Sequence, residues 1–231
     1  MKINAAMVFA AGFGTRLGTL VADRPKPMIQ VGGRLLIDHA LDIVGGAGIH
    51  NPVVNLHYHA AKLAGYLQHR PGVQTVLERP QILDTGGGLS NAVNLLGRGP
   101  VFTLNSDTVW KGGNPLTKLT DDWKPEMMDA LLLLVPACRA HGHSGAPDFA
   151  LDPDGRIRRA GNSGLIYTGA QIIDTRILDG VEKKVFSLNE VWNGLIRCRR
   201  LYGIEYPGEI GDAGSPEGIE ASEKLLRFGP G

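Results

Sequence analysis

The residues best suited to chemistry form a glycine loop near the start of the chain. Residues 10–16 have the sequence AAGFGTR and follow directly on an apolar run at residues 5–10. Gly12 and Gly14 let backbone N–H groups approach phosphate oxygens without a Cβ in the way. A Gly-x-Gly also occurs in simple tight turns, so the loop alone does not identify a phosphate site.

Two cations accompany this loop. Arg16 lies within it, and Lys26 follows between Pro25 and Pro27. An arginine offers a planar fork to phosphate oxygens, whereas a lysine offers a compact point charge. The flanking prolines stiffen the backbone and favour a fixed ammonium group. Together the loop and the cations predict a triphosphate site; the alternative for Lys26 is an ordinary exposed lysine.

Two other nucleotide-binding motifs fit less well. A dinucleotide fold requires an acidic residue about 20 positions after its glycine loop, to bind the ribose. Here the loop is followed instead by the basic Pro25-Lys26-Pro27 segment. The P-loop pattern GxxxxGK[ST] is also absent. An NAD-dependent dehydrogenase is therefore disfavoured, and nicotinamide binding without pyrophosphate release would revive it.

The elements that position these residues alternate between strands and helices. Apolar periodicity predicts strands at residues 5–10, 52–56, 73–77, 101–104, 129–135, 165–173 and 201–206. It predicts helices at residues 34–47, 60–69, 89–96, 188–198 and 216–228, and a hairpin at residues 149–157. This order is typical of a doubly wound α/β fold with a mainly parallel mixed sheet flanked by helices. In such folds ligands bind at the carboxyl ends of the strands, where the glycine loop lies.

Composition excludes several classes of protein. The chain has 231 residues, of which 43% are hydrophobic, and a net charge of +1. This lack of basic excess gives no support for a nucleic-acid partner. No stretch approaches the roughly 20 apolar residues that span a bilayer. Cys138 and Cys198 are too few for a disulfide framework and suit a reducing cytoplasm.

Several motifs together resemble the sugar-1-phosphate nucleotidyltransferases, also called nucleoside-diphosphate-sugar pyrophosphorylases. Residues 10–16 with Pro25-Lys26-Pro27 resemble their signature, and residues 83–88 (LDTGGG) resemble their second glycine loop. Residues 104–107 (LNSD) and 211–215 (GDAGS) resemble the two segments that carry magnesium-binding aspartates. The motifs occur in the family's order over nearly the whole chain. The likeness is greatest to short bacterial members that use N-acetylmuramate 1-phosphate or mannose 1-phosphate.

The resemblance implies a reaction and roles for the cations. A sugar-1-phosphate oxygen attacks the α-phosphorus of a nucleoside triphosphate, and pyrophosphate leaves. Such catalysis rests on positioning and charge neutralisation. Arg16 would hold the leaving phosphates, and the backbone around Gly12, Gly14 and Thr15 would cradle them. Lys26 would lie near the α-phosphate or the sugar phosphate.

The resemblance also implies a Mg²⁺ cofactor bound by two aspartates. Asp107 ends an apolar strand, where a carboxylate points into the ligand cleft, and counts with Arg16 and Lys26 as catalytic. Asp212 is the second expected ligand. It follows Gly211, where the family often has an aromatic or apolar residue, so a turn or helix cap remains the alternative for Asp212.

Further residues are matched to the nucleobase and the sugar. The family pattern assigns the base to the backbone of Ala10, Ala11 and Gly12 and to Gly86 and Gly87, which leaves uracil, thymine and guanine poorly separated. The sugar-side positions match more loosely, and each can equally be structural; they are Gly88, Asn105, Asp148, Thr168 and Gly169.

The resemblance implies one nucleotidyltransferase domain over residues 1–231, with a nucleotide-binding half at about 1–110 and a sugar-binding half at about 111–231. We expect transfer from UTP to N-acetylmuramate 1-phosphate in peptidoglycan recycling, by a monomer or small homo-oligomer. The alternatives are a mannose- or heptose-1-phosphate guanylyltransferase and a catalytically silent nucleotide-sugar sensor. Cys138, His141 and His143 suggest zinc, but no fourth ligand is evident.

Overall fold

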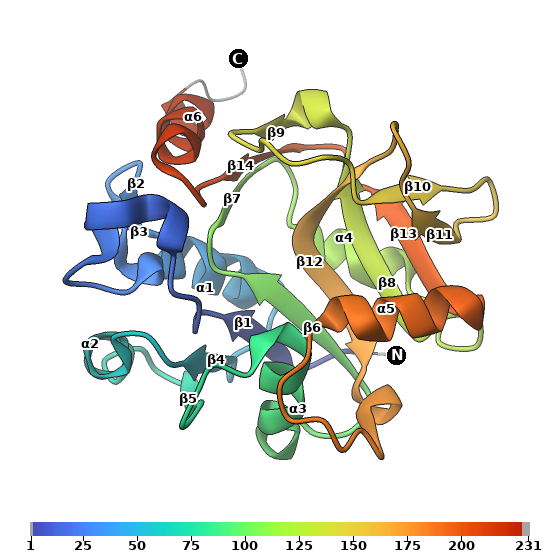
Figure 1. Ribbon diagram of the computed structural model, residues 1–231, viewed down its shortest axis with the longest axis horizontal. Coiled ribbons are helices and arrows are strands. Elements are labelled where there is room, and N and C mark those ends of the chain that lie inside the picture. Colours follow the sequence, from blue (N-terminus) through green and yellow to red (C-terminus); the bar gives the residue numbers. More distant parts are fainter. Residues whose placement is uncertain (1, 228–231) are drawn as a thin grey trace.

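The structure is a computed structural model that describes residues 2–227. A seven-stranded sheet forms the centre of the molecule (Figure 1). The strand order is β13-β8-β12-β6-β1-β4-β5, and only β12 runs antiparallel to its neighbours. The bounds are β1 Ala6–Phe9, β4 Val53–Leu56, β5 Gln74–Leu77, β6 Pro100–Asn105, β8 Ala130–Val135, β12 Ile166–Asp174 and β13 Leu201–Glu205. The predicted α/β class with a mainly parallel mixed sheet is confirmed.

Helices cover both faces of this sheet. One face packs against α1 (Leu36–Gly46), α2 (Ala60–Leu67) and α4 (Pro115–Asp122). The other packs against α3 (Asp84–Leu96) and α5 (Leu188–Arg197). The sequence of β8 explains why helices cover both faces. Alternate leucines along this strand enter the cores on opposite faces, and every residue of the strand is buried. Continuous apolar runs of this kind are typical of strands covered on both sides.

A smaller layer lies across the carboxyl ends of β1 and β6. It is a three-stranded sheet of order β7-β14-β9, with β7 Thr108–Lys111, β14 Glu209–Asp212 and β9 Ala140–His141. The last helix, α6 (Pro216–Arg227), packs on this sheet. Val109 and Ala213 share a small apolar core with Leu17 of the glycine-loop region. The three-stranded sheet and the glycine loop are therefore held against each other.

The remaining elements are short. Two hairpins are formed by β2 (Gln30–Val31) with β3 (Arg34–Leu35) and by β10 (Phe149–Leu151) with β11 (Ile157–Arg159). Short 3-10 helices span Thr15–Val21, Lys26–Met28, Ala137–Arg139 and Thr175–Leu178. Within residues 2–227 the helices are all too short or too polar to span a bilayer.

Most predicted elements are present with small shifts at their ends, and two predictions were wrong in detail. The helix expected at residues 89–96 begins at Asp84, so the second glycine segment is helical rather than a loop. The helix expected at residues 34–47 begins at Leu36, because residues 34–35 form β3. The sequence did not predict β7, β14 or α4. The expected last helix residue, Phe228, lies outside the described residues.

Candidate active site

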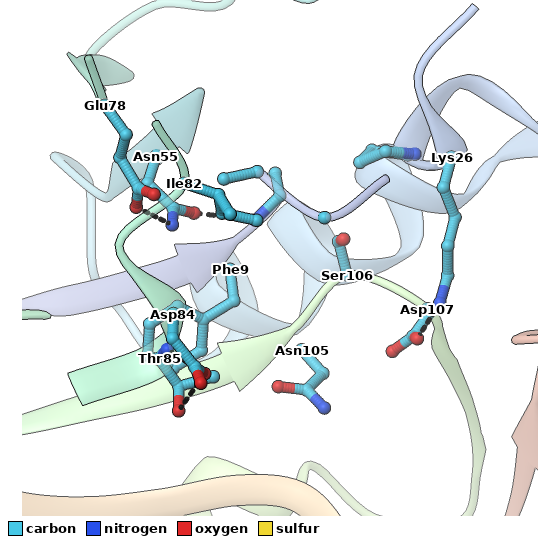
Figure 2. A pocket seen from close by; sticks show the side chains of 14 residues that line it. Phe9, Lys26, Asn55, Glu78, Ile82, Asp84, Thr85, Asn105, Ser106 and Asp107 are labelled. Carbon is cyan, nitrogen blue, oxygen red and sulfur yellow. Dashed lines mark hydrogen bonds and ion pairs between the residues drawn. The ribbon is translucent and has the colours of Figure 1, made fainter. Parts of the chain in front are cut away.

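A pocket of about 260 Å³ opens at the carboxyl ends of β1 and β6, where the sequence predicted a ligand site (Figure 2). Its walls come from the glycine loop, the Lys26 segment and the ends of four parallel strands. The lining residues are Phe9, Ala10, Ala11, Gly12, Lys26, Pro27, Asn55, Glu78, Ile82, Asp84, Thr85, Asn105, Ser106 and Asp107.

The glycine loop holds Lys26 at this pocket. Gly14 has a φ of 65°, in the left-handed region that favours glycine, and begins the turn that contains Thr15 and Arg16. A Cβ at Gly14 would lie 3.1 Å from the Cβ of Lys26, so the loop packs directly on the lysine stem. Lys26 Nζ then forms an ion pair with Asp107 Oδ2, which Figure 2 shows at one side of the pocket.

Pairing of β7 with β14 brings the two predicted metal ligands together. Asp107 immediately precedes β7, and Asp212 ends β14. The Ala213 N–H donates to the Asp107 carbonyl at 2.9 Å, so the two acids lie on adjacent chain segments although far apart in sequence. Asp212 Oδ1 accepts the Gly214 N–H at 3.0 Å, which orients this carboxylate.

Two further residues contact the Asp212 segment. The Asp212 Oδ2 lies 3.2 Å from His143 Nδ1, a contact that the sequence did not predict. In the sequence, His143 stood out only as part of the Cys-x-x-His-x-His pattern, where it was considered as a zinc ligand and not as a partner of Asp212. A Cβ at Gly214 would collide with the Arg16 guanidinium, so Arg16 lies against the same segment. Among residues 2–227 no carboxylate lies within ion-pair distance of Arg16, whose charge is therefore available to a ligand.

The chemistry of this site suits Mg²⁺. Carboxylate oxygens from Asp107 and Asp212 are the donors that a hard cation prefers. Within the described part of the chain, no group of three or more His, Cys, Asp or Glu side chains is arranged to hold a metal. Mg²⁺ commonly uses one or two carboxylates and completes its shell with phosphates and waters. Asp107, which lines the pocket, and Asp212, on the adjacent chain segment, fit that donor set.

A buried Asn–Glu pair forms the opposite wall of the pocket. The Ala10 N–H donates to Asn55 Oδ1 at 2.7 Å, and Asn55 Nδ2 donates to Glu78 Oε1 at 2.7 Å. The Leu83 N–H donates to Glu78 Oε2 at 2.7 Å. The Ala10 amide, predicted to face the base, is thus already paired. Glu78 was missed by the sequence analysis, although an acid directly after β5 carries the same signal that identified Asp107.

The second glycine segment packs on the segment before α5. Gly86 and Gly87 are not pocket-lining residues, and their N–H groups donate to the Phe186 carbonyl at 2.9 and 3.0 Å. A Cβ at Gly87 would collide with the Lys184 carbonyl oxygen. A Cβ at Gly88 would lie 2.6 Å from Glu78 Oε1. The pocket itself receives Asp84 and Thr85 from this segment.

Of the predicted sugar-side residues, some lie at the pocket and others form hydrogen bonds within the fold. Asn105 lines the pocket, and Gly169, with a φ of 85° at a bulge of β12, leaves room for it: a Cβ there would lie 2.8 Å from the Asn105 side chain. Asp148 Oδ2 accepts the Tyr167 N–H at 2.8 Å. Thr168 is buried and its hydroxyl donates to the Leu133 carbonyl, which is a structural bond. Of these residues, Asn105 lines the pocket, Gly169 packs against Asn105, and Asp148 and Thr168 are seen only in hydrogen bonds within the fold.

The sequence of the chain is similar to those of known proteins. Residues 6–144 match the family described as the MobA-like NTP transferase domain. The chain is 37% identical to an N-acetylmuramate alpha-1-phosphate uridylyltransferase of Caulobacter vibrioides over 96% of both chains. It is 30% identical to a protein of the same name from Neisseria meningitidis serogroup B, over 95% of this chain and 97% of that one.

Solved structures show the same fold. A UDP-glucose pyrophosphorylase from Acinetobacter baumannii aligns with a TM-score of 0.79 at 19% identity, over 97% of this chain and 93% of that chain. HddC from Yersinia pseudotuberculosis, complexed with GMP-PN, aligns with a TM-score of 0.76 at 19% identity, over 96% and 99% of the two chains. With the full-length sequence similarity, these findings show that the chain belongs to the sugar-1-phosphate nucleotidyltransferases, enzymes built on the MobA-like NTP transferase domain.

Proposed function

We propose that this protein transfers the uridylyl group of UTP to N-acetylmuramate 1-phosphate, with release of pyrophosphate. The observation that carries the proposal is the pairing of β7 with β14, which brings Asp107 and Asp212 together beside Lys26 and Arg16. The choice of base and sugar is supported by two relatives of that name that match nearly the full chain.

The reaction joins a sugar-phosphate oxygen to the α-phosphorus and breaks the bond between that phosphorus and the oxygen bridging to the β-phosphate. The bonding electrons leave with pyrophosphate. Arg16 and the backbone N–H groups around Gly14 and Thr15 bind the leaving phosphates. Lys26, which lines the pocket, is proposed to contact the α-phosphate or the sugar phosphate and to neutralise charge as they approach each other. Asp107 and Asp212 would hold a Mg²⁺ ion, which would supply further positive charge beside the phosphates.

The pocket walls would orient the other parts of the substrates. The base enters between the Ala11–Gly12 backbone and the wall that carries Thr85, and Glu78 with Asn55 keeps that wall rigid through buried hydrogen bonds. In this proposal Ala10, Gly86, Gly87 and Gly88 act through the shape of the wall. Asn105, Asp148 and the bulge at Gly169 receive the sugar, with Thr168 anchoring the bulge.

The setting proposed for this activity is cytoplasmic recycling of cell-wall sugars by a monomer or small homo-oligomer. Both cysteines, Cys138 and Cys198, are free and exposed, which suits a reducing compartment. The near-neutral net charge of +1 supports small-molecule substrates over a nucleic-acid or membrane partner.

The decisive experiment measures pyrophosphate release in the presence of Mg²⁺. UTP, GTP, dTTP, CTP and ATP are each combined with the 1-phosphates of N-acetylmuramic acid, N-acetylglucosamine, mannose and glucose. We expect chelator-sensitive release with UTP and N-acetylmuramate 1-phosphate. Preference for GTP with mannose 1-phosphate would replace the proposed substrates, and nucleotide-sugar binding without any turnover would indicate a regulatory protein instead.

A further inference from the structure

We propose that Arg159 binds a carboxylate on the sugar substrate and thereby selects sugar 1-phosphates that carry an acidic substituent. The inference rests on the proposed function, because it concerns the sugar side of the same site. It assigns the choice of sugar to a residue that the sequence motifs did not identify.

Arg159, at the end of β11, is unusual among the arginines. Of those in residues 2–227, it is the only half-buried arginine with no carboxylate within 4.0 Å. The other half-buried arginines all have acidic partners: Arg139 with Glu205, Arg156 with Asp154, and Arg200 with Asp129. A partly desolvated cation without a counter-charge is costly. It is therefore a candidate for a group that receives its counter-charge from a ligand.

The surroundings of Arg159 hold its guanidinium in a fixed position. The guanidinium carbon lies 4.8 Å from the centre of the Phe149 ring and 5.9 Å from that of Trp192. Its Nε donates to Asn193 Oδ1 at 2.9 Å, and one Nη donates to the Asn189 carbonyl at 3.2 Å. These contacts leave other guanidinium N–H groups free. A fixed, planar fork of this kind suits bidentate binding of a carboxylate.

Burial lowers the pKa of the Arg159 guanidinium, and the negative charge of Asp148 partly opposes this effect. An arginine remains protonated at neutral pH even so. Asp148 raises the pKa through its charge but forms no ion pair with Arg159, since it lies beyond 4.0 Å. Burial thus makes the protonated form less favourable, and no neighbouring carboxylate pairs with it.

A chain of contacts connects Arg159 to the sugar side of the pocket. Asn105 lines the pocket and packs at the Gly169 bulge of β12. Two residues earlier in the same strand, Tyr167 donates its N–H to Asp148, and its ring lies 5.0 Å from that of Trp192. Trp192 in turn lies under Arg159. Figure 1 shows the β10–β11 hairpin next to α5, where Arg159 forms its hydrogen bonds.

The proposed sugar supplies the matching anion. N-acetylmuramate carries a carboxylate on a lactyl ether, whereas N-acetylglucosamine is the same sugar without that group. In this proposal the sugar phosphate lies at Lys26, the ring lies beside Asn105, and the carboxylate-bearing substituent is directed toward Arg159. The sugar phosphate is a second anion in the same site, and the experiment separates the two anions by comparing sugars that share the phosphate.

The test compares Arg159→Met with Arg158→Met. Arg158 is the adjacent, exposed residue of β11 and pairs with Asp152, so it provides a matched control. We expect Arg159→Met to lower kcat/KM for N-acetylmuramate 1-phosphate by about 10- to 100-fold, the range for loss of a charged hydrogen-bonding partner. Its kcat/KM for N-acetylglucosamine 1-phosphate should change by less than about threefold. Arg158→Met should leave both values unchanged.

A second variant, Arg159→Lys, preserves the cation above the aromatic rings if the methionine variant fails to fold, and should retain part of the preference. An equal loss for both sugars in a folded Arg159 variant would overturn the inference, as would an unchanged preference. If the wild type turns over no substrate pair, the proposed function fails separately. Calorimetric binding of the two sugar phosphates to wild type and variants then decides the role of Arg159.

Discussion

Lys26 and Asp107 form an ion pair at one side of the pocket, with 14% and 20% of their side chains exposed. Removing one member leaves the other partly buried and unpaired, which destabilises a protein more than removing both. Lys26→Met should therefore lower the free energy of unfolding by about 1–3 kcal/mol. It should also lower kcat/KM by at least about 100-fold, because positive charge at the phosphates is lost.

Urea denaturation and steady-state kinetics measure these two effects. The double variant Lys26→Met with Asp107→Asn should recover most of the stability but none of the activity. Wild-type kinetics in Lys26→Met would show that this lysine is only a structural partner of Asp107.

Asp107→Asn alone tests the metal site. The amide keeps the shape of the side chain but removes the anionic oxygen that Mg²⁺ prefers. We expect turnover to fall by about 100- to 1,000-fold, in the range seen when one electrostatic group is removed from an active site. A raised requirement for Mg²⁺ should accompany the loss. Unaltered turnover with an unaltered Mg²⁺ requirement would remove Asp107 from the site.

Gly14 is the residue on which the position of Lys26 depends. Alanine there would adopt a φ of 65° at a cost of about 1–2 kcal/mol and would press on the Lys26 Cβ at 3.1 Å. Gly14→Ala should therefore lower stability by that amount and raise the KM for the nucleotide. Gly45→Ala is the control, since Gly45 lies in α1 with open space around it. Equal effects of the two substitutions would contradict this role for Gly14.

At the scale of elements, the sequence predicted those whose pattern is local. The apolar runs of β1, β4 and β6 were recognisable, and each ends at the pocket. The strand β14 has only four residues, and its partners β7 and β9 come from distant parts of the chain. No local pattern encodes such pairing, so the position of Asp212 could be expected only from family resemblance. The contact between His143 and Asp212 depends on the same pairing.

The second glycine segment was predicted as a loop, in line with its resemblance to a family glycine loop and with the low helix propensity of glycine. The structure shows why it is helical. Gly86 and Gly87 allow the segment before α5 to lie directly on the first turn of α3, where the Phe186 carbonyl accepts two helix N–H groups. Such N–H groups have no partner within a helix, and a contact from elsewhere in the fold compensates. Tertiary packing therefore overrides local propensity here.

Gly87→Ala tests this contact between α3 and the Lys184–Phe186 segment. The added Cβ collides with the Lys184 carbonyl, a backbone atom that cannot rotate away. We expect a loss of about 1–3 kcal/mol in the free energy of unfolding, as for overpacked core sites. Gly65→Ala, in α2 with nothing nearby, should be neutral or stabilising by up to about 1 kcal/mol. Similar stabilities for the two variants would show that the segment is free to move away from α3.

At the scale of the molecule, one continuous sheet joins the two halves expected from the sequence. The antiparallel strand β12, within the expected sugar-binding half, pairs with β6 of the expected nucleotide-binding half and with β8 of its own half. Alternation of strands and helices predicted a mainly parallel sheet, and a single reversed strand inside the sheet does not change that alternation. The consequence of this pairing is that β12 has hydrogen-bonded neighbours on both sides, so the sheet has no free edge between the two expected halves.

The continuous sheet predicts that both halves unfold in one transition. Leu104 in β6 and Leu132 in β8 are fully buried, on opposite faces of the sheet. Replacing either by alanine should lower stability by about 2–5 kcal/mol and move the whole transition. UTP with Mg²⁺ at about 100 times its Kd should add roughly 2.7 kcal/mol to each variant, since ligand bound in one half stabilises the entire cooperative unit. Calorimetry with circular dichroism measures the number of unfolding transitions and their shift with nucleotide. Two separate transitions, of which only one responds to nucleotide, would show that the pairing of β12 with β6 and β8 does not couple the halves.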